Sequence, residues 1–95
     1  MKRIRYLVAY DIADPRRLRA VHKLVRGFGD AMQYSVFVCD LTSAERARLV
    51  TSLSETIDRT VDRVAVVTLG DGGTDSMFWF LGVKPPLPAS GSRIV

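Results

Sequence analysis

The sequence predicts an α+β domain with two helices on one face of a single sheet. Three observations support this prediction. Segments with strand and helix patterns follow one another in the order β-α-β-α-β-β. The extended segment 32–41 is long enough to bend into two strands. The first strand-to-helix turn, residues 10–14, contains no glycine, so the dinucleotide-binding fingerprint is absent.

The first strand and helix are marked by clear local signals. Residues 3–10 predict a strand whose second half is apolar on both faces and should therefore be covered on both. Asp14 predicts a helix N-cap, and Pro15 fits the first helical position. Gly27 and Gly29 predict the end of this helix. Its apolar residues recur at helical spacing: Leu18, Val21, Val25 and Phe28.

The remaining elements follow from similar patterns. Thr42 and Glu45 have the spacing of a capping box, which predicts the start of a second helix. Strands are predicted over 62–69 and 77–81, separated by a glycine-rich loop. The prolines at 85, 86 and 88 should end regular structure. We therefore expect a domain over residues 1–83 and a flexible, Pro-rich tail over 84–95.

Two architectures fit this order of elements. One is a ferredoxin-like split βαβ sandwich with an extra C-terminal strand, and the other is a small parallel doubly wound sheet. We favour the ferredoxin-like fold, which leaves one sheet face without helices. Leu7, Ala9, Val67 and Trp79 would make that face a large apolar patch. This predicts a homodimer through the open sheet face, with the last strand reaching the partner's edge.

The bulk composition excludes several classes of protein. A chain of 95 residues with 47% hydrophobic residues fits one domain. It has no apolar run near the roughly 20 residues that span a bilayer, and no signal-type stretch at its start. We therefore expect a cytoplasmic protein without a membrane partner.

The chain has a single cysteine, Cys39, which excludes an internal disulfide and a cysteine-based zinc site. We expect Cys39 to be a core residue.

Positive charge is concentrated in the first third of the chain. The net charge is +4 overall, but residues 1–29 carry eight cations against two acids, a net of +6. A solvated outer helix face would explain the cations, yet no acid lies between Asp14 and Asp30 to pair with them. This absence favours a surface that binds nucleic acid. The candidate residues in the first helix are Arg16, Arg17, Arg19, Lys23 and Arg26.

Several short motifs together resemble a known family. Tyr10-Asp11-Ile12 ends the first strand, and an arginine-rich helix follows. Gly29-x-x-x-Gln33-x-Ser35-Val36-Phe37 and the strand start Asp62-Arg63-Val64 come next. This combination resembles the small CRISPR-associated adaptation proteins, the "Cas-two" family, over residues 1–83.

The resemblance implies a ferredoxin-like homodimer with two roles. One is a metal-dependent endonuclease on RNA or DNA, using Mg²⁺ or Mn²⁺ shared at the dimer interface. The other is a subunit that binds duplex DNA and bridges two dimers of the CRISPR integrase during spacer acquisition. The family's catalytic aspartate falls on Asp11, its neighbouring tyrosine on Tyr10 and its strand phenylalanine on Phe37. Its helix arginines fall on the cluster 16–19. The family usually has arginine where this chain has Ala31, which weakens the nuclease assignment.

Asp11 alone is a poor magnesium site, because Mg²⁺ prefers octahedral oxygen coordination. A two-fold axis near the strand end would supply a second Asp11. The alternative is that Asp11 is a turn residue that accepts backbone N–H bonds.

Asp14 fits a helix cap better than a ligand, and His22 fits a packing residue better than a general base. The aromatic residues Tyr6, Tyr34, Phe37 and Trp79 do not match an RNA-stacking sheet and are expected in the core or dimer interface.

Three functions stay open at this point. The first is a DNA-binding subunit of CRISPR adaptation, and the second is a metal-dependent phosphodiesterase. The third is a toxin-like ribonuclease of the same fold that acts independently of CRISPR.

Overall fold

The computed structural model describes residues 2–70 of the 95-residue chain. The strand predicted over 77–81, including Trp79, and the tail predicted over 84–95 lie outside the described residues. The elements are β1 (Ile4–Asp11), α1 (Pro15–Arg26), β2 (Asp30–Gln33), β3 (Val36–Leu41), α2 (Ser43–Thr56) and β4 (Arg63–Gly70).

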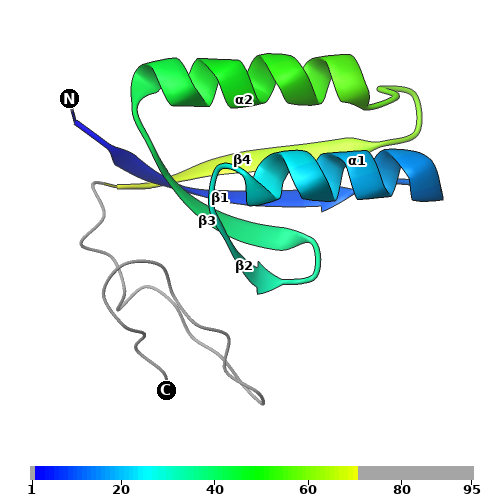
Figure 1. Ribbon diagram of the computed structural model, residues 1–95, viewed down its shortest axis with the longest axis horizontal. Helices are drawn as coiled ribbons and strands as arrows, with labels where there is room; N and C mark the ends of the chain where they lie inside the picture. Colours follow the sequence, from blue (N-terminus) through cyan, green and yellow to red (C-terminus); the bar gives the residue numbers. More distant parts are fainter. Residues whose placement is uncertain (1, 71–95) are drawn as a thin grey trace.

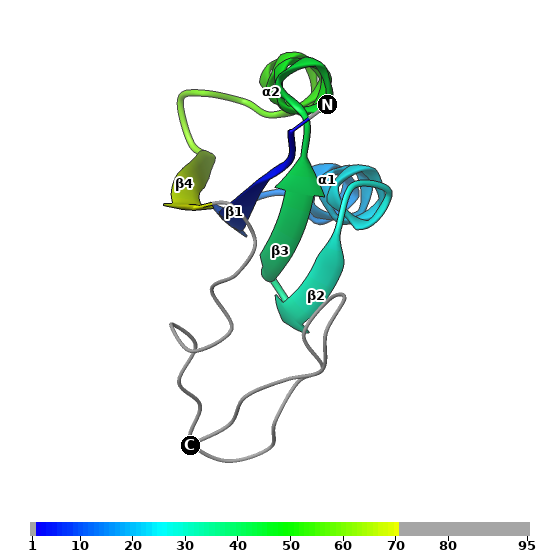
Figure 2. The same ribbon diagram turned by 90° about the vertical axis from the view of Figure 1, so that its left-hand side faces the viewer.

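The sheet has the strand order β2-β3-β1-β4, and every neighbouring pair is antiparallel. β3 lies between β1 and β2, and β1 lies between β3 and β4, so two split βαβ units interleave. Segment 32–41 does bend into two strands, at the turn formed by Tyr34 and Ser35. This topology confirms the ferredoxin-like fold and excludes the parallel doubly wound sheet. Both helices cover the same face of the sheet (Figures 1 and 2).

Both helix starts are capped by the predicted residues. The Asp14 carboxylate accepts hydrogen bonds from the backbone N–H groups of Arg16 and Arg17 at 2.9 and 3.0 Å. The Thr42 hydroxyl accepts from the Glu45 backbone N–H, and the Glu45 carboxylate accepts from the Thr42 backbone N–H. These bonds satisfy backbone donors that a helix start otherwise leaves unpaired, and they fix where each helix leaves the preceding strand.

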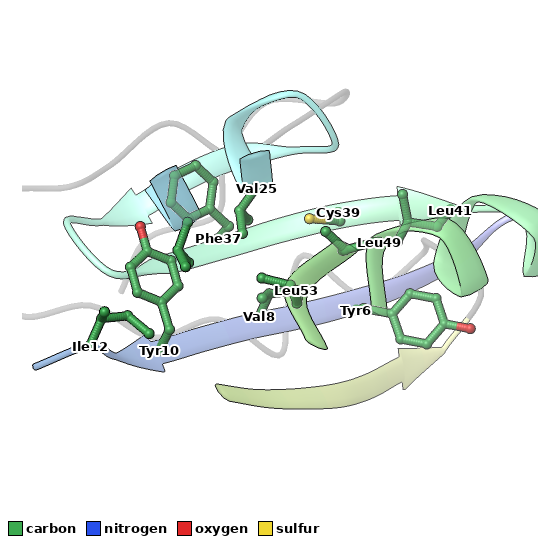
Figure 3. Close-up of a cluster of buried hydrophobic side chains, with 11 residues drawn as sticks. Tyr6, Val8, Tyr10, Ile12, Val25, Phe37, Cys39, Leu41, Leu49 and Leu53 are labelled. Atoms are coloured by element: carbon green, nitrogen blue, oxygen red, sulfur yellow. The ribbon is translucent and has the colours of Figure 1, made fainter. Parts of the chain in front are cut away.

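The main core lies between the sheet and the two helices (Figure 3). Alternate residues of β1 and β3 point into it because side chains of a strand alternate between faces. Cys39 is fully buried there, and burial raises the pKa of its thiol to about 12. This confirms its assignment as a core residue. The buried residues of the sheet and helices are Tyr6, Val8, Tyr10, Phe37, Cys39, Leu41, Val21, Val25, Leu49 and Leu53.

Gly29 lets the chain pass close to β3 after α1 ends. A Cβ atom added at this position would collide with the Val38 carbonyl oxygen and the Cys39 sulfur. The neighbouring atoms belong to the backbone and to a fully buried side chain, so they have little room to move. The glycine of the Gly-x-x-x-Gln motif is therefore required by the packing of the α1–β2 connection against β3.

The face of the sheet away from the helices, here called the open face, is less exposed than the sequence predicts. Val38 and Met32 are buried on it, and Leu7 is half-buried against them. Arg5 is 2% exposed and binds Asp40 of the neighbouring strand through two hydrogen bonds, at 2.8 and 3.0 Å. The exposed apolar surface is instead concentrated on β4. Of the residues predicted to form the apolar patch, Leu7 and Ala9 are half-buried, Val67 is 47% exposed, and Trp79 lies outside the described residues.

Candidate nucleic-acid interface

Four cations form a stripe along the outer surface of α1. Their spacing of three, four and three residues places them on one face of the helix, opposite the apolar face that enters the core. All four are exposed, and within residues 2–70 their side chains make no recorded hydrogen bond or ion pair. We call this set the basic stripe: Arg16, Arg19, Lys23 and Arg26.

Arg17, which the sequence also suggested as a nucleic-acid-binding residue, does not belong to this stripe. Its guanidinium donates from Nε to Asp62 Oδ2 at 2.8 Å and from Nη2 to Asp62 Oδ1 at 3.3 Å. The Asp62 side chain is completely buried, while that of Arg17 is 29% exposed. An arginine that pairs with a buried carboxylate is held by that carboxylate, because releasing it would leave the buried charge unpaired. The structure thus gives Arg17 a structural role.

Asp62 joins three segments that meet at the end of β1. Besides Arg17, its carboxylate accepts backbone hydrogen bonds from Ala13 at 2.9 Å and from Asp58 at 2.8 Å. The Arg17 hydrogen bond, followed by those from Ala13 and Asp58, holds the pKa of Asp62 well below its usual range. Since Ala13 lies two residues after Asp11, this network holds the backbone that follows Asp11 in place.

Asp11 itself is an exposed residue at the end of β1. Its side chain is 79% exposed, and its Oδ2 lies 3.6 Å from a guanidinium nitrogen of Arg63, its cross-strand partner in β4. Such an exposed ion pair holds its partners weakly. The prediction that Asp11 accepts only local backbone bonds finds no support, because no such bond is recorded for its side chain in residues 2–70. The carboxylate is therefore open to an external ligand.

Tyr10 points the other way. Strand alternation places it on the helix face, where its side chain is 6% exposed and its ring stacks with Phe37 (Figure 3). Its hydroxyl lies 2.9 Å from Nδ1 of His22. Burial, together with nearby Tyr34, raises the pKa of Tyr10. The two candidate catalytic residues are thus on opposite faces of the sheet, and Tyr10 is placed as a packing residue of the core.

The basic stripe and Asp11 are also separated. The stripe lies on the outside of the helix layer, whereas strand alternation places the Asp11 side chain on the open face. The cation that the structure brings to Asp11 is Arg63, which belongs to the Asp62-Arg63-Val64 motif and was not predicted as a site residue. The sequence shows Arg63 as the cation that follows Asp62. It does not show the register between β1 and β4, which places Arg63 opposite Asp11.

A single protomer offers few ligands for a metal ion. Within residues 2–70 no group of three or more His, Cys, Asp or Glu side chains is close enough to hold one. Asp14 is used as a helix cap, and Asp62 is buried and paired. Only Asp11 remains open at this end of the sheet among the acids 11, 14 and 62. This donor set would fit Mg²⁺ only with a second copy of Asp11, and the shared site therefore stays a prediction.

A groove of about 700 Å³ is lined by residues of α2, of β4 and of the end of β1. Its apolar lining includes Val50, Leu53 and Val66. Asp11, Arg59 and Arg63 also line it. Phosphates carry charge and would be poorly accommodated along its apolar part. Besides Arg63, the groove lining contains the exposed cation Arg59, so any phosphate held there would lie at the charged end of the groove.

The assignments of His22 and of three aromatic residues can be checked in the described residues. His22 is half-buried and packs edge-on against Phe37, which confirms its role as a packing residue. Tyr6 and Phe37 are core residues, as predicted. Tyr34 is not, because its side chain is 69% exposed at the turn between β2 and β3. Of the two places predicted for these aromatics, the core is thus excluded for Tyr34, and the dimer interface stays a prediction.

The family assignment rests on a direct match. Residues 4–77 match the model of the family described as CRISPR associated protein Cas2. The chain belongs to the Cas2 family.

Relatives with curated names support the same assignment. A Rhodospirillum rubrum protein named CRISPR-associated endoribonuclease Cas2 1 is 46% identical over 65 residues, which are 68% of this chain and 64% of that protein. A Thermodesulfovibrio yellowstonii protein named CRISPR-associated endoribonuclease Cas2 2 is 36% identical over 86 residues, 90% of this chain and 91% of that protein. The similarity to Cas2 proteins thus includes a match over nearly the full chain.

Solved structures agree with the Cas2 fold. Streptococcus pyogenes Cas2 superposes with a TM-score of 0.76 at 33% identity, covering 83% of this chain and all of that one. A hypothetical protein from Thermus thermophilus gives a TM-score of 0.76 at 28% identity, covering 87% of this chain and 95% of that one. In residues 2–70, neither helix is long and apolar enough to cross a membrane.

Proposed function

We propose that this Cas2-family chain binds duplex DNA non-specifically through the basic stripe of α1, as a subunit of CRISPR adaptation that bridges integrase dimers. The observation that carries the proposal is the set of four exposed cations without an acidic partner within residues 2–70. Cations that bind no neighbouring acid are available to phosphates, and each phosphate contact releases condensed counterions.

The shape of the stripe supports binding to the backbone of DNA rather than to bases. From Arg16 to Arg26 the helix rises by about 15 Å. The stripe is made only of long cationic side chains, which contact phosphates and position a duplex without reading its sequence. Arginine makes bidentate contacts to phosphate, so three arginines and one lysine suit this role.

Salt dependence tests this function. Affinity of the full-length protein for a duplex without a preferred sequence should fall steeply as salt rises, with the logarithm of the binding constant linear in the logarithm of salt. Fluorescence anisotropy with labelled duplexes of unrelated sequence measures it. Failure to bind at about 50 mM salt, or strong preference for one sequence, would contradict the proposal.

A second candidate function is metal-dependent phosphodiester hydrolysis at Asp11. It is favoured by the exposed Asp11 carboxylate at the end of β1 and by the endoribonuclease names of the relatives. The substrate would be RNA or DNA, and the ion would be Mg²⁺ or Mn²⁺. A bound ion of this kind supplies an activated water and stabilises charge on the scissile phosphate. Two Asp11 side chains across a homodimer axis would hold it.

In that arrangement the residues of this chain have distinct roles. Asp11 would provide metal-binding oxygens. Arg63, now 3.6 Å from Asp11, would be free to bind a flanking phosphate once the carboxylate takes up a metal ion. Asp62 would keep the strand end in place through Ala13. The proposal requires a dimer, because one protomer supplies too few ligands in its described part.

Replacing Asp11 by asparagine separates the two functions. We expect cleavage of RNA or DNA in Mg²⁺ to fall by about 100-fold or more, because the neutral amide is a poor metal ligand. Duplex affinity should change by less than about twofold, since the basic stripe is intact. Gel-based cleavage assays and anisotropy measure the two quantities, and spacer acquisition in cells shows which function adaptation needs.

The matched control is Asp14→Asn. Asparagine caps a helix as well as aspartate does, so this substitution removes a nearby acid and keeps the fold. It should leave both cleavage and binding near the wild-type values. Cleavage that survives Asp11→Asn would assign the hydrolysis to another residue or a contaminant. Acquisition that survives it would identify the binding role as sufficient.

Membership of the Cas2 family also bears on the third possible function, a toxin-like ribonuclease. A toxin-like ribonuclease acting independently of CRISPR would share the fold but not the family match over residues 4–77. The family match therefore favours the adaptation function over the toxin-like one. Integrase genes and repeat arrays beside the gene for this chain would support the same choice.

A further inference from the structure

Tyr34 is an exposed aromatic residue whose orientation is fixed. It lies at the turn between β2 and β3, with 69% of its surface exposed. Its ring stacks on the His22 ring of α1, with centroids 5.5 Å apart and planes 23° from parallel. A ring has two faces, and His22 covers one of them. The high exposure leaves the other face available for a further planar group.

The base of this stack is itself held by the core. Nδ1 of His22 is 2.9 Å from the Tyr10 hydroxyl, and the same hydroxyl is 3.4 Å from the Tyr34 carbonyl oxygen. One proton arrangement satisfies both contacts: His22 donates to the Tyr10 oxygen, and the Tyr10 hydroxyl donates to Tyr34. The Tyr10 backbone N–H also donates to the Ser35 carbonyl at 3.1 Å. Two hydrogen bonds from Tyr10 therefore hold the turn that carries Tyr34.

The stacked pair lies next to the basic stripe. His22 is three residues after Arg19 and four residues before Arg26, so helical spacing places it beside both. Its position on α1 falls between the stripe and the apolar face. An aromatic platform flanked by free cations is the combination that binds unpaired nucleotides: the ring stacks with a base, and the cations hold the phosphates.

We propose that Tyr34, supported by His22, is a stacking platform for an unpaired nucleobase at the edge of the basic stripe. The proposal rests on the proposed nucleic-acid binding and deepens it, because it adds single-stranded segments to the ligands that the stripe can hold. Stacking requires only the face of a base, so the platform is expected to accept any base and both RNA and DNA. In this arrangement Tyr10 is a positioning residue for the platform.

Two oligonucleotides and two variants test the platform. The ligands are a blunt duplex and the same duplex with single-stranded overhangs of about five nucleotides. Tyr34→Ala is expected to weaken binding of the overhang duplex roughly 5- to 150-fold, the range for loss of one base-stacking contact. It should change binding of the blunt duplex by less than about twofold. Tyr34→Phe keeps the ring and should retain affinity for the overhang within about threefold.

Each outcome bears on a distinct claim. If Tyr34→Ala loses affinity equally for both duplexes, or loses none for the overhang duplex, the platform proposal is overturned. The proposal that the basic stripe binds duplex DNA would be unaffected. A wild-type protein that binds the overhang but not the blunt duplex would contradict the proposed duplex function and support the platform. Binding to neither would contradict both. Because Tyr34 is exposed, the variants should melt within about 2 °C of the wild type, and a larger shift would assign Tyr34 a structural role.

Discussion

Reversing the charge of Arg16 and Arg19 together is expected to lower affinity for duplex DNA roughly 100-fold at about 100 mM salt. Both side chains are exposed members of the basic stripe. If each contacts a phosphate, the slope of log affinity against log salt should become shallower by about 0.9 per lost contact, or about 2 in total. Anisotropy titrations at several salt concentrations measure affinity and slope together.

The matched control reverses Arg46 and Arg48 on α2, which are also exposed. Either pair of Arg→Glu changes lowers the net charge by four, from +4 to 0. The two double variants thus differ in where the charge is lost and not in how much. If both lose affinity equally, overall charge and not the α1 stripe determines binding. If neither does, the binding surface lies elsewhere on the protein.

Replacing Asp62 by asparagine is expected to lower the midpoint of thermal unfolding by about 10 °C or more. Both carboxylate oxygens accept bonds, Oδ1 from Ala13 and Arg17, and Oδ2 from Arg17 and Asp58. An amide has one acceptor oxygen, so its NH₂ group would face donors and Arg17 would lose its counter-charge. Circular dichroism melts measure the change. Asp30→Asn, at an exposed acid, is the control and should shift the midpoint little.

The same variant should change the dependence of stability on pH. The pKa of Asp62 is lower in the folded protein than its usual value of 3.8, chiefly because Arg17 hydrogen bonds to its ionised form. A lowered pKa contributes stability above the unfolded value, and this contribution disappears as pH falls toward the folded value. The stability difference between wild type and Asp62→Asn should therefore be constant near neutral pH and shrink below about pH 4. A difference that grows in acid would contradict this assignment.

The sequence alone was sufficient for the local features. Asp14, Thr42 and Glu45 act on backbone groups within three residues, so their spacing determines their role. The basic stripe follows from helical periodicity in the same way. The turn that divides segment 32–41 consists of Tyr34 and Ser35, and the predicted bend depended on a pattern within that segment. These features depend on neighbours along the chain.

The features that were missed depend on contacts between distant residues. Arg17 and Asp62 are 45 positions apart, so no local pattern separates Arg17 from the other cations of α1. Arg63 meets Asp11 through the register of β1 and β4. Tyr34 was expected in the core or the dimer interface, and its contact with His22 of α1 depends on where the β2–β3 turn lies in the fold. Tertiary packing decided each of these cases.

The position of β1 has a consequence for how the protein is made. This strand is translated before its two partners in the sheet, β3 and β4, which end at Leu41 and Gly70. Neither half of the domain contains a complete sheet, because each βαβ unit needs a strand from the other. A nascent chain halted before residue 63 would leave one edge of β1 without its native partner and exposed to other chains. Folding of this domain is therefore expected to finish only after translation has passed β4.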